Sequence, residues 1–355
     1  MGLLDRILIE IRGLNEPVML EAQKRMDSLA KPLGSLGTLE KIAIQIAGIT
    51  GHVKNEIHKK CTIIMAADHG ICAEGVSCAP QEVTAIQSLN MLKGITGICA
   101  ISKVNNADIR VVDIGVMSDI DGLNLVKKKI RYGTNNFLKG PAMEGEEVIK
   151  AIEIGIEMVK DLVKEGYNLI GTGEMGIGNT TCSSAVFMAL TGSSANHSVG
   201  KGGGITEEAF EHKKSVIEEA IRLNQPNSSD PIDVLTKVGG LDLAGMVGCF
   251  LGAAYYRVPI VIDGFISATA AFVAYKINPL VKDFLIPSHC SLEPGYMCIM
   301  KKMGLNPMLY LEMRLGEGTG CPIAFHIIET GLSVMNNMAT FEEATIISDY
   351  LVDIR

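Results

Sequence analysis

The sequence lacks the features of several protein classes. It has no excess of basic residues, because its 32 lysines and arginines are scattered and are outnumbered by 40 aspartates and glutamates, which leaves a net charge of -8. The basic surface of a nucleic-acid-binding protein is therefore missing, and nucleic acid is not an expected partner. Its nine cysteines include no C-x-x-C pair, which argues against a disulfide framework and a zinc site. We expect reduced, mostly buried thiols in a cytoplasmic protein.

Long apolar runs are also missing. The most apolar stretch, residues 243–256, lies between Asp242 and Arg257 and is too short to span a bilayer. The first residues, MGLLDRILIEIRGLNE, carry charges every few positions and do not form the basic region and apolar core of a signal peptide. We therefore expect no membrane partner.

Five short apolar or β-branched runs have the length of strands. They are CTIIMAA from Cys61, IRVVDIGV from Ile109, YNLIG from Tyr167, VPIVIDGFI from Val258 and FLIPS from Phe284. Segments with the period of a helix lie between them, most clearly residues 146–166 and 207–224. Continuously apolar strands that alternate with helices are typical of a parallel sheet covered on both faces. The sequence therefore predicts an α/β fold with a doubly wound, mainly parallel sheet flanked by helices.

The two ends of the chain predict a second, smaller unit. Residues 1–50 have a predominantly helical pattern, and so do IAFHIIETGLSVMN and TFEEATIISDYLVDI after Pro322. At 355 residues the chain also exceeds the size at which a single hydrophobic core usually stops growing. We predict a small helical domain from residues 1–50 and 322–355, and a large α/β nucleotide-binding catalytic domain over residues 51–321.

Polar or glycine-rich residues mark the end of every predicted strand. In chain order they are Asp68-His69-Gly70, Asp113, Gly171-Thr172-Gly173-Glu174, Asp263-Gly264 and Ser288-His289. The ligand crevice of an open parallel sheet lies outside the carboxyl ends of its strands, so these residues are expected at one site. The acids and histidines lack the spacing of metal ligands, so no metal is expected. Lone histidines at strand ends usually make structural hydrogen bonds.

A glycine-rich turn, GTGEMGIGNTTCSSA, joins a predicted strand to a predicted helix at residues 171–185. Asn179, Thr180 or Thr181 could cap that helix, and the amides at a helix start suit a phosphate. The turn matches the G-x-G-x-x-G pattern, but no acid follows about twenty positions later to bind a ribose hydroxyl. It therefore indicates a mononucleotide phosphate rather than a dinucleotide. The alternative is a tight turn that needs glycine only for steric reasons.

Two further segments combine glycines with candidate ligand contacts. VGKGGGITEE, residues 199–208, precedes a helix that Thr206 could cap, and it could be an anion-binding nest or a flexible lid. LEMRLGEGTGCP holds Glu317 between two glycines, where a flat ligand can approach the carboxylate as a general base requires. The alternative is a glutamate that ties down its own loop through backbone amides.

Several long motifs together resemble one known family, the nicotinate-nucleotide:dimethylbenzimidazole phosphoribosyltransferases, which make α-ribazole phosphate for cobamide assembly. The resemblance covers nearly the whole chain. Its motifs are MDSLAKPLGSLGTLE (26–40), ADHGICAEGVS (67–77), RVVDIGV (110–116), GTGEMGIGNTT (171–181), IDGFIS (262–267), SHCSLEPG (288–295) and MRLGEGTG (313–320). The resemblance implies a homodimer with a large domain built on a parallel sheet.

The resemblance also implies the roles of site residues. Glu317 would deprotonate the acceptor, and Glu174 and Lys213 would support it or the substrate. Nicotinate mononucleotide would be a substrate, held by the glycine loops, with no cofactor. The substrate-binding set would be Gly176, Gly178, Asn179, Thr180, Gly202, Gly203, Gly204, Asp263, Gly264, Ser291, Leu315, Gly318, Ser77 and Pro80.

The chain departs from the family pattern at the expected acceptor pocket. The family usually has Ser-Ala-Tyr/Phe-Pro and then Gln-Met, whereas this chain has CAP after Ser77 and Ile86-Gln87 further on. Cys290 and Tyr296 stand where arginine and histidine are common. A pocket without its aromatic wall and polar anchor could accept phenol or p-cresol, whose hydroxyl Glu317 would deprotonate.

Two other functions fit parts of the sequence. The chain could be a catalytically weak subunit of a heterodimer with a paralogue, although Glu317, Glu174 and Lys213 argue against this. An NAD-dependent oxidoreductase is disfavoured by the missing ribose-binding acid.

Overall fold

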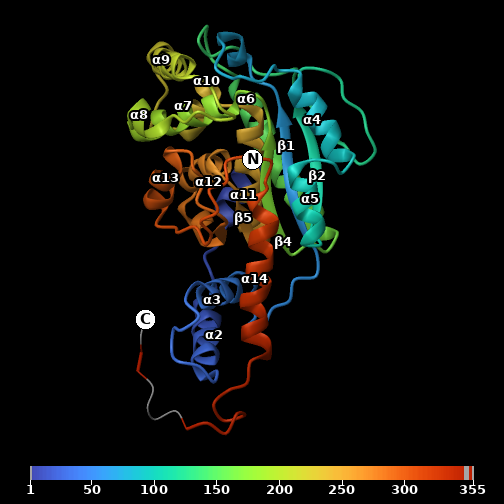
Figure 1. Ribbon diagram of the computed structural model, residues 1–355, viewed down its shortest axis with the longest axis vertical. Helices are drawn as coiled ribbons and strands as arrows, with labels where there is room; N and C mark the ends of the chain where they lie inside the picture. Colours follow the sequence, from blue (N-terminus) through green and yellow to red (C-terminus); the bar gives the residue numbers. More distant parts are fainter. Residues whose placement is uncertain (1, 348–351, 354–355) are drawn as a thin grey trace.

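The structure is a computed structural model that describes residues 2–347 and 352–353. At its centre lies a six-stranded sheet with the order β3-β2-β1-β4-β5-β6, in which every pair of neighbours is parallel (Figure 1). The strands are β1 (Lys60–Ala67), β2 (Asp108–Gly115), β3 (Val126–Lys127), β4 (Leu169–Met175), β5 (Ile260–Ile262) and β6 (Leu285–Pro287). The predicted parallel sheet is confirmed, and all its predicted strands are present. The two-residue β3 was not predicted.

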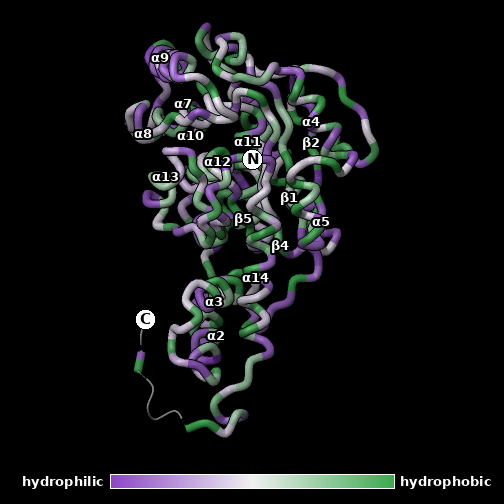
Figure 2. Tube along the Cα trace, in the orientation of Figure 1, coloured by the Kyte–Doolittle hydropathy of each residue, from purple (hydrophilic) through white to green (hydrophobic). Residues whose placement is uncertain are grey.

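The helices lie between and around these strands (Figure 1). They are α1 (Leu3–Glu10), α2 (Glu16–Ser28), α3 (Thr38–Thr50), α4 (Val83–Leu92), α5 (Gly97–Val104), α6 (Gly145–Lys164), α7 (Asn179–Thr191), α8 (Ala195–Ser198), α9 (Glu207–Asn224), α10 (Pro231–Val238), α11 (Leu241–Tyr256), α12 (Phe265–Ile277), α13 (Gly295–Met303) and α14 (Gly320–Asn337), with the 3₁₀ helices η1 (Gly70–Glu74) and η2 (Pro279–Phe284). The predicted helices at 146–166 and 207–224 are confirmed as α6 and α9. The amphipathic α9 is mainly hydrophilic in Figure 2.

Strand β1 shows why the sheet is covered on both faces. Successive side chains of a strand point to opposite faces, so a strand that is apolar at every position must be packed on both. Ile63 and Met65 lie in the core that α6 and α11 cover, whereas Ile64 and Ala66 pack beneath α4 and α5. Helices α6 and α11 approach so closely that a Cβ at Gly155 would collide with the backbone of α11.

Helices α2, α3 and the lower part of α14 form a group below the sheet (Figure 1), and their apolar cluster continues into strands β4, β5 and β6. Met26, Ile46 and Phe325 belong to their shared apolar cluster. Helix α1 is not part of this group, because it packs on α6 and α11. The division into domains at residues 50 and 322 stays a prediction.

The predicted helix over TFEEATIISDYLVDI is wrong for residues 340–347, which form turns and loop. Phe341 N donates to Ser28 O, and Ala30 N donates to Ala339 O, so this segment pairs with the chain after α2. Residues 348–351 and 354 of the predicted helix lie outside the described part of the chain.

The strand order places a topological switch between β1 and β4. From β1 the chain continues outward through β2 and β3, and it then returns to the other side of β1 with β4. Ligands of open α/β sheets bind at such a switch, outside the carboxyl ends of the strands. The register pairs Met65 with Glu174, so the end of β4 lies beside the residues that follow β1. Across the described residues we find no helix with the length and apolarity that a membrane span needs.

Candidate active site

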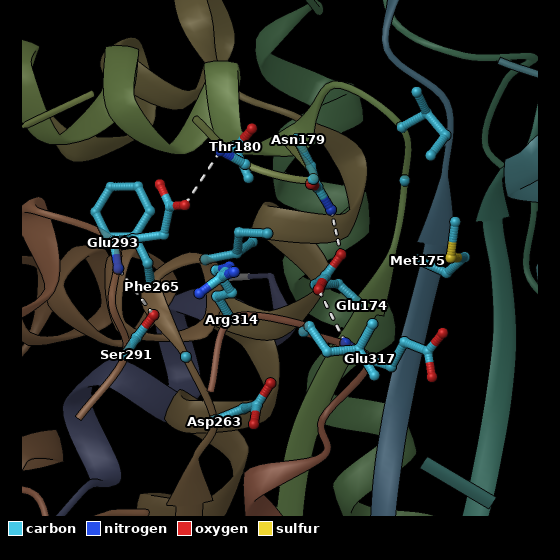
Figure 3. A pocket seen from close by; sticks show the side chains of 18 of the residues that line it. Glu174, Met175, Asn179, Thr180, Asp263, Phe265, Ser291, Glu293, Arg314 and Glu317 are labelled. Atoms are coloured by element: carbon cyan, nitrogen blue, oxygen red, sulfur yellow. Dashed lines mark hydrogen bonds between the residues drawn. The ribbon is translucent and has the colours of Figure 1, made fainter. Parts of the chain in front are cut away.

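A cavity of about 690 Å³ opens at the carboxyl ends of the central strands (Figure 3). Most of the predicted site residues line it, namely Ser77, Glu174, Gly176, Gly178, Asn179, Thr180, Gly202, Gly203, Asp263, Gly264, Ser291, Leu315 and Glu317. Four of them do not line it. Lys213 and Gly318 are buried and are not among the lining residues, although Lys213 Nζ contacts the lining residue Thr180, and Gly204 and Pro80 are exposed. The expectation that strand-end residues meet at one site is confirmed for Glu174, Asp263, Gly264 and His289, whereas Asp68, His69, Gly70, Asp113 and Ser288 do not line the cavity. Contacts of these residues with a substrate stay a prediction.

Glu317 presents its carboxylate at the start of α5. Its Oε1 accepts a hydrogen bond from Gln87 Nε2 at 2.7 Å, and its Oε2 accepts one from Ile98 N at 3.2 Å. Ile98 is the second residue of α5, where the helix dipole favours a negative charge. The alternative that this glutamate ties down its own loop is therefore wrong. Its backbone φ of 60° lies in the left-handed region, as do those of the flanking Gly316 and Gly318.

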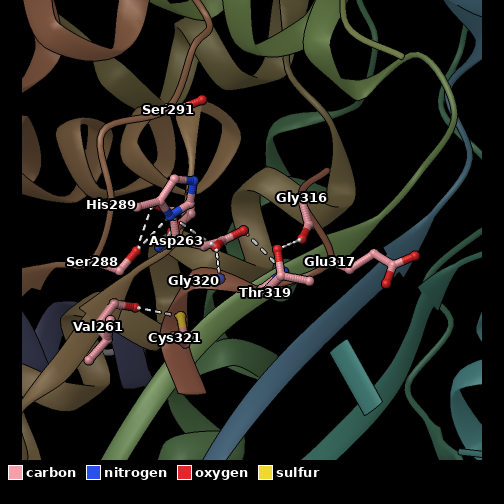
Figure 4. A network of polar contacts seen from close by, with 12 residues as sticks. Val261, Asp263, Ser288, His289, Ser291, Gly316, Glu317, Thr319, Gly320 and Cys321 are labelled. Atoms are coloured by element: carbon pink, nitrogen blue, oxygen red, sulfur yellow. Dashed lines mark hydrogen bonds and ion pairs between the residues drawn. The ribbon is translucent and has the colours of Figure 1, made fainter. Parts of the chain in front are cut away.

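Asp263 is the residue that ties down this loop (Figure 4). Its Oδ1 accepts from Gly320 N at 2.6 Å, and its Oδ2 accepts from Gly318 N at 3.1 Å. Burial raises the pKa of Asp263 to about 7, although the backbone N–H groups oppose that shift. Asp263 was predicted to bind substrate, and it does line the cavity, but its carboxylate is already bonded to the loop that carries Glu317.

Glu174 is the second-last residue of β4 and lies next to Glu317. Its Oε1 accepts from Glu317 N at 3.3 Å, and its Oε2 accepts from Asn179 Nδ2. Burial, followed by the negative charge of Asp242, raises the pKa of Glu174 to about 8. Glu174 is therefore mainly an uncharged acid at neutral pH, which gives the site a group able to donate a hydrogen bond.

The first glycine turn brings the start of α7 to the cavity. The N-cap is Gly178 in a left-handed conformation with φ 93°, so the prediction of Asn179, Thr180 or Thr181 as the cap is wrong. The Asn179 side chain turns to Glu174 instead, and Thr180 accepts a hydrogen bond from Lys213. The start of α7 at Gly178–Thr180 still lines the cavity, and the positive end of a helix dipole suits a phosphate.

Lys213 connects the two glycine loops. It is almost fully buried on α9, and its Nζ donates to Thr180 Oγ1 at 2.9 Å and to Gly200 O at 3.0 Å. Burial lowers the pKa of Lys213 to about 8, against the raising effect of Glu293. Glu293 Oε1 in turn accepts from Gly202 N at 3.2 Å. The prediction that Thr206 caps α9 is confirmed by its bond from Ala209 N.

The histidines at the strand ends make structural contacts, as expected. His289 Nδ1 lies 3.1 Å from Ser288 Oγ, and burial lowers the pKa of His289 to about 4, so the ring is neutral. His69 is fully buried beside Asp242. In the described part of the chain, no group of three or more His, Cys, Asp or Glu side chains is arranged to hold a metal ion.

Several lining residues were not predicted as site residues. Gln87 lines the cavity and donates to Glu317, so a glutamine is present at the expected acceptor pocket. Arg314 lines the cavity between Glu293 and Glu174 in Figure 3. Its position three residues before Glu317, in a motif already singled out, was the available signal. The others are Cys78, Ala79, Val83, Met175, Ile177, Phe265, Ile266, Ser267, Glu293, Glu312 and Gly316.

A family model described as phosphoribosyltransferase matches residues 11–346, which is nearly the whole chain. The chain belongs to this phosphoribosyltransferase family. As a member, it is 57% identical over 356 residues to the nicotinate-nucleotide–dimethylbenzimidazole phosphoribosyltransferase of Clostridium tetani, with 100% of this chain and 98% of the relative covered. The protein of that name from Clostridium acetobutylicum is 56% identical over 343 residues. The alignment covers 97% of this chain and 97% of that protein.

A solved structure shares the phosphoribosyltransferase fold seen here. The nicotinate-nucleotide–dimethylbenzimidazole phosphoribosyltransferase of Thermus thermophilus superposes with a TM-score of 0.89 at 37% identity, covering 94% of this chain and 100% of that one. The resemblance drawn from the motifs is confirmed. The names of these relatives support neither a phenolic acceptor nor an oxidoreductase.

Proposed function

We propose that this phosphoribosyltransferase moves the phosphoribosyl group of nicotinate mononucleotide to dimethylbenzimidazole, giving α-ribazole phosphate and nicotinate. The observation that carries the proposal is the Glu317 carboxylate, which faces a cavity also lined by two glycine loops that Lys213 joins. The names of the relatives support this acceptor.

The phosphate of nicotinate mononucleotide binds where the two glycine loops meet. The start of α7 at Gly178–Thr180 and the loop at Gly202–Gly203 line this part of the cavity, although Gly202 N already donates to Glu293 and Asn179 N to Gly176 O. An ammonium has three N–H donors, and two of those on Lys213 are used inside the protein, so one remains for a phosphate oxygen. Arg314 adds a second positive charge in the cavity.

Glu317 acts on the acceptor. It takes the proton from one imidazole nitrogen of dimethylbenzimidazole, and the other nitrogen attacks C1′ of the ribose from the face opposite nicotinate. The bond from C1′ to nicotinate breaks with its electron pair passing to the ring nitrogen, so the pyridinium leaves as a neutral ring and the β-linkage becomes α. A positioned general base contributes on the order of 10²–10⁴-fold to such a step. We propose that no cofactor is needed, because this leaving group requires no charge neutralisation.

We also propose that the enzyme works as a homodimer in the cytoplasm. Tyr310, Leu311 and Leu315 are 72%, 49% and 61% exposed beside the cavity, and apolar side chains of this size are common in subunit interfaces. The alternative, a heterodimer with a paralogue, is tested by measuring the size and the activity of the purified chain alone. If the purified chain alone is dimeric and active, no second chain is needed.

Incubation of the purified protein with nicotinate mononucleotide and dimethylbenzimidazole tests the function. We expect equimolar nicotinate and α-ribazole phosphate with a chelator present, and slower or no reaction with phenol or p-cresol. NMR of the product gives the configuration at C1′. A product with the β configuration, or no release of nicotinate, would remove the proposal.

Asp263→Asn should change kcat more than it changes KM, and it should lower kcat. The asparagine side chain keeps one acceptor oxygen but turns an NH₂ group toward a backbone N–H, so the Glu317 loop loses one of its two bonds. We expect a stability loss of about 1–3 kcal/mol and a fall in kcat of on the order of 10²-fold from the displaced base. Thermal unfolding and steady-state kinetics measure both. Asp283→Asn, on η2 and away from the cavity, is the control, and wild-type kcat in Asp263→Asn would contradict the assigned role.

A further inference from the structure

A buried row of polar side chains continues behind Glu174. His69 Nε2 lies 3.3 Å from Asp242 Oδ2, and its Nδ1 lies 3.2 Å from Cys182 Sγ. Asp242 Oδ2 also accepts a hydrogen bond from Asn179 Nδ2 at 3.3 Å, and this amide nitrogen donates to Glu174 as well. The contacts therefore run without a break from His69 to Glu174, although neither His69 nor Asp242 is among the cavity-lining residues.

The row has a defined direction of hydrogen bonding. A side-chain amide nitrogen only donates, so Asn179 presents its NH₂ group to both carboxyl groups and its oxygen elsewhere. Burial alone would lower the pKa of His69, but Asp242 and Cys182 together raise it well above its ordinary value. His69 and Asp242 therefore face each other in the interior, and the Asp242 carboxyl group holds the amide of Asn179 in one orientation.

We propose that Asp242 and His69 are positioning residues, which orient the acid Glu174 through the side chain of Asn179. The Asp242 carboxylate fixes the amide, and the amide fixes Glu174 Oε2 as an acceptor, while Glu174 Oε1 accepts from Glu317 N. The negative charge of Asp242 also opposes ionisation of Glu174. The inference rests on the proposed function, because it assigns these residues to the same reaction.

Other charged and titratable groups surround the two ends of the row. Glu174 is faced by Asp242 at the start of α11, Asp263 after β5, Glu317 before α14 and Arg314 from the cavity wall. Those next to His69 are Asp242, Cys182 on α7, Cys72 on η1 and the neighbouring Asp68. Burial is the largest cause of the raised pKa of Glu174. The charge of Asp242 is the second cause and has a larger effect than that of Asp263.

Substitutions in this row should therefore shift the pKa of Glu174 in predictable directions. The pKa of Glu174 is raised to about 8, so the acid is protonated below that pH and loses its proton as the pH rises through it. Asp242→Asn removes a negative charge and lowers this pKa. Asn179→Ala removes a hydrogen bond that favours the ionised form, so it raises the pKa.

The test is a titration of Glu174 in the ligand-free protein by carbon-13 NMR of labelled glutamate, with Glu174→Gln to assign the signal. We expect Asp242→Asn to lower the midpoint by about one pH unit or more, and Asn179→Ala to raise it. His69→Gln keeps an N–H donor for Asp242 and should not lower it. Asp113→Asn, another buried strand-end carboxylate, should leave it unchanged.

Kinetics complete the test. Asp242→Asn should reduce kcat by about 10- to 100-fold with little change in KM, and the alkaline fall in activity should begin at lower pH. An unshifted midpoint in Asp242→Asn overturns the inference, and if that variant does not fold, an unshifted midpoint in Asn179→Ala does so. The titration needs no turnover, so it can be read even if the wild-type protein has no transferase activity. Such inactivity would remove the proposed function, whereas the midpoint shifts of Glu174 would still show whether Asp242 acts on it through Asn179.

Discussion

Glu317→Gln should lower kcat by about 10²–10⁴-fold, the range that a positioned general base contributes. Glutamine has nearly the same shape and can still accept the bond from Ile98 N, but it cannot take up a proton. The phosphate-binding loops are untouched, so KM for nicotinate mononucleotide should change little. Steady-state rates at saturating acceptor measure this effect.

The matched control for this change is Glu312→Gln. Glu312 lines the same cavity but is exposed, and none of the described hydrogen bonds ties it to the loop glycines. We expect its kcat to stay at the wild-type value. Full turnover by Glu317→Gln would show that another group accepts the proton.

Lys213→Met should chiefly weaken binding of nicotinate mononucleotide. Methionine fills a similar buried volume, but the charge-assisted contact with phosphate is lost. Such a contact contributes about 1.5–3 kcal/mol, so KM should rise about 10- to 150-fold. Calorimetry with inorganic phosphate measures the same loss without turnover.

The pH dependence of phosphate binding gives a second readout of Lys213. Burial lowers its pKa to about 8, so the wild-type affinity for inorganic phosphate should fall as the pH rises through that value. In Lys213→Met this fall should disappear. Lys214→Met is the control, because this neighbour on α9 pairs with Glu211 at the surface. Unchanged phosphate affinity in Lys213→Met would place the phosphate elsewhere.

The sheet and the location of the site could be predicted because both follow from local patterns. Strands such as β1 are apolar at every position, and the carboxyl ends of parallel strands share one edge of the sheet. Strand β3 could not be predicted, since two residues carry no periodic signal. The tail at residues 340–347 has a helical pattern but pairs with the chain after α2 instead.

The partners of the site residues could not be predicted because they come from distant segments. Gln87 and Ile98 lie more than two hundred positions before Glu317, and nothing in the local sequence links them. The predicted N-cap of α7 was wrong for a related reason. Three good capping residues were present, but tertiary contacts with Glu174 and Lys213 took two of their side chains, and Gly178 ended the turn in a left-handed conformation.

A crystal structure with nicotinate mononucleotide and dimethylbenzimidazole bound tests the central claim most directly. We predict the phosphate between the Gly176–Thr180 and Gly202–Gly203 segments, and an acceptor nitrogen about 2.6–3.2 Å from a Glu317 carboxylate oxygen. Density for both ligands outside this cavity, or an acceptor whose ring nitrogens face away from Glu317, would contradict the account.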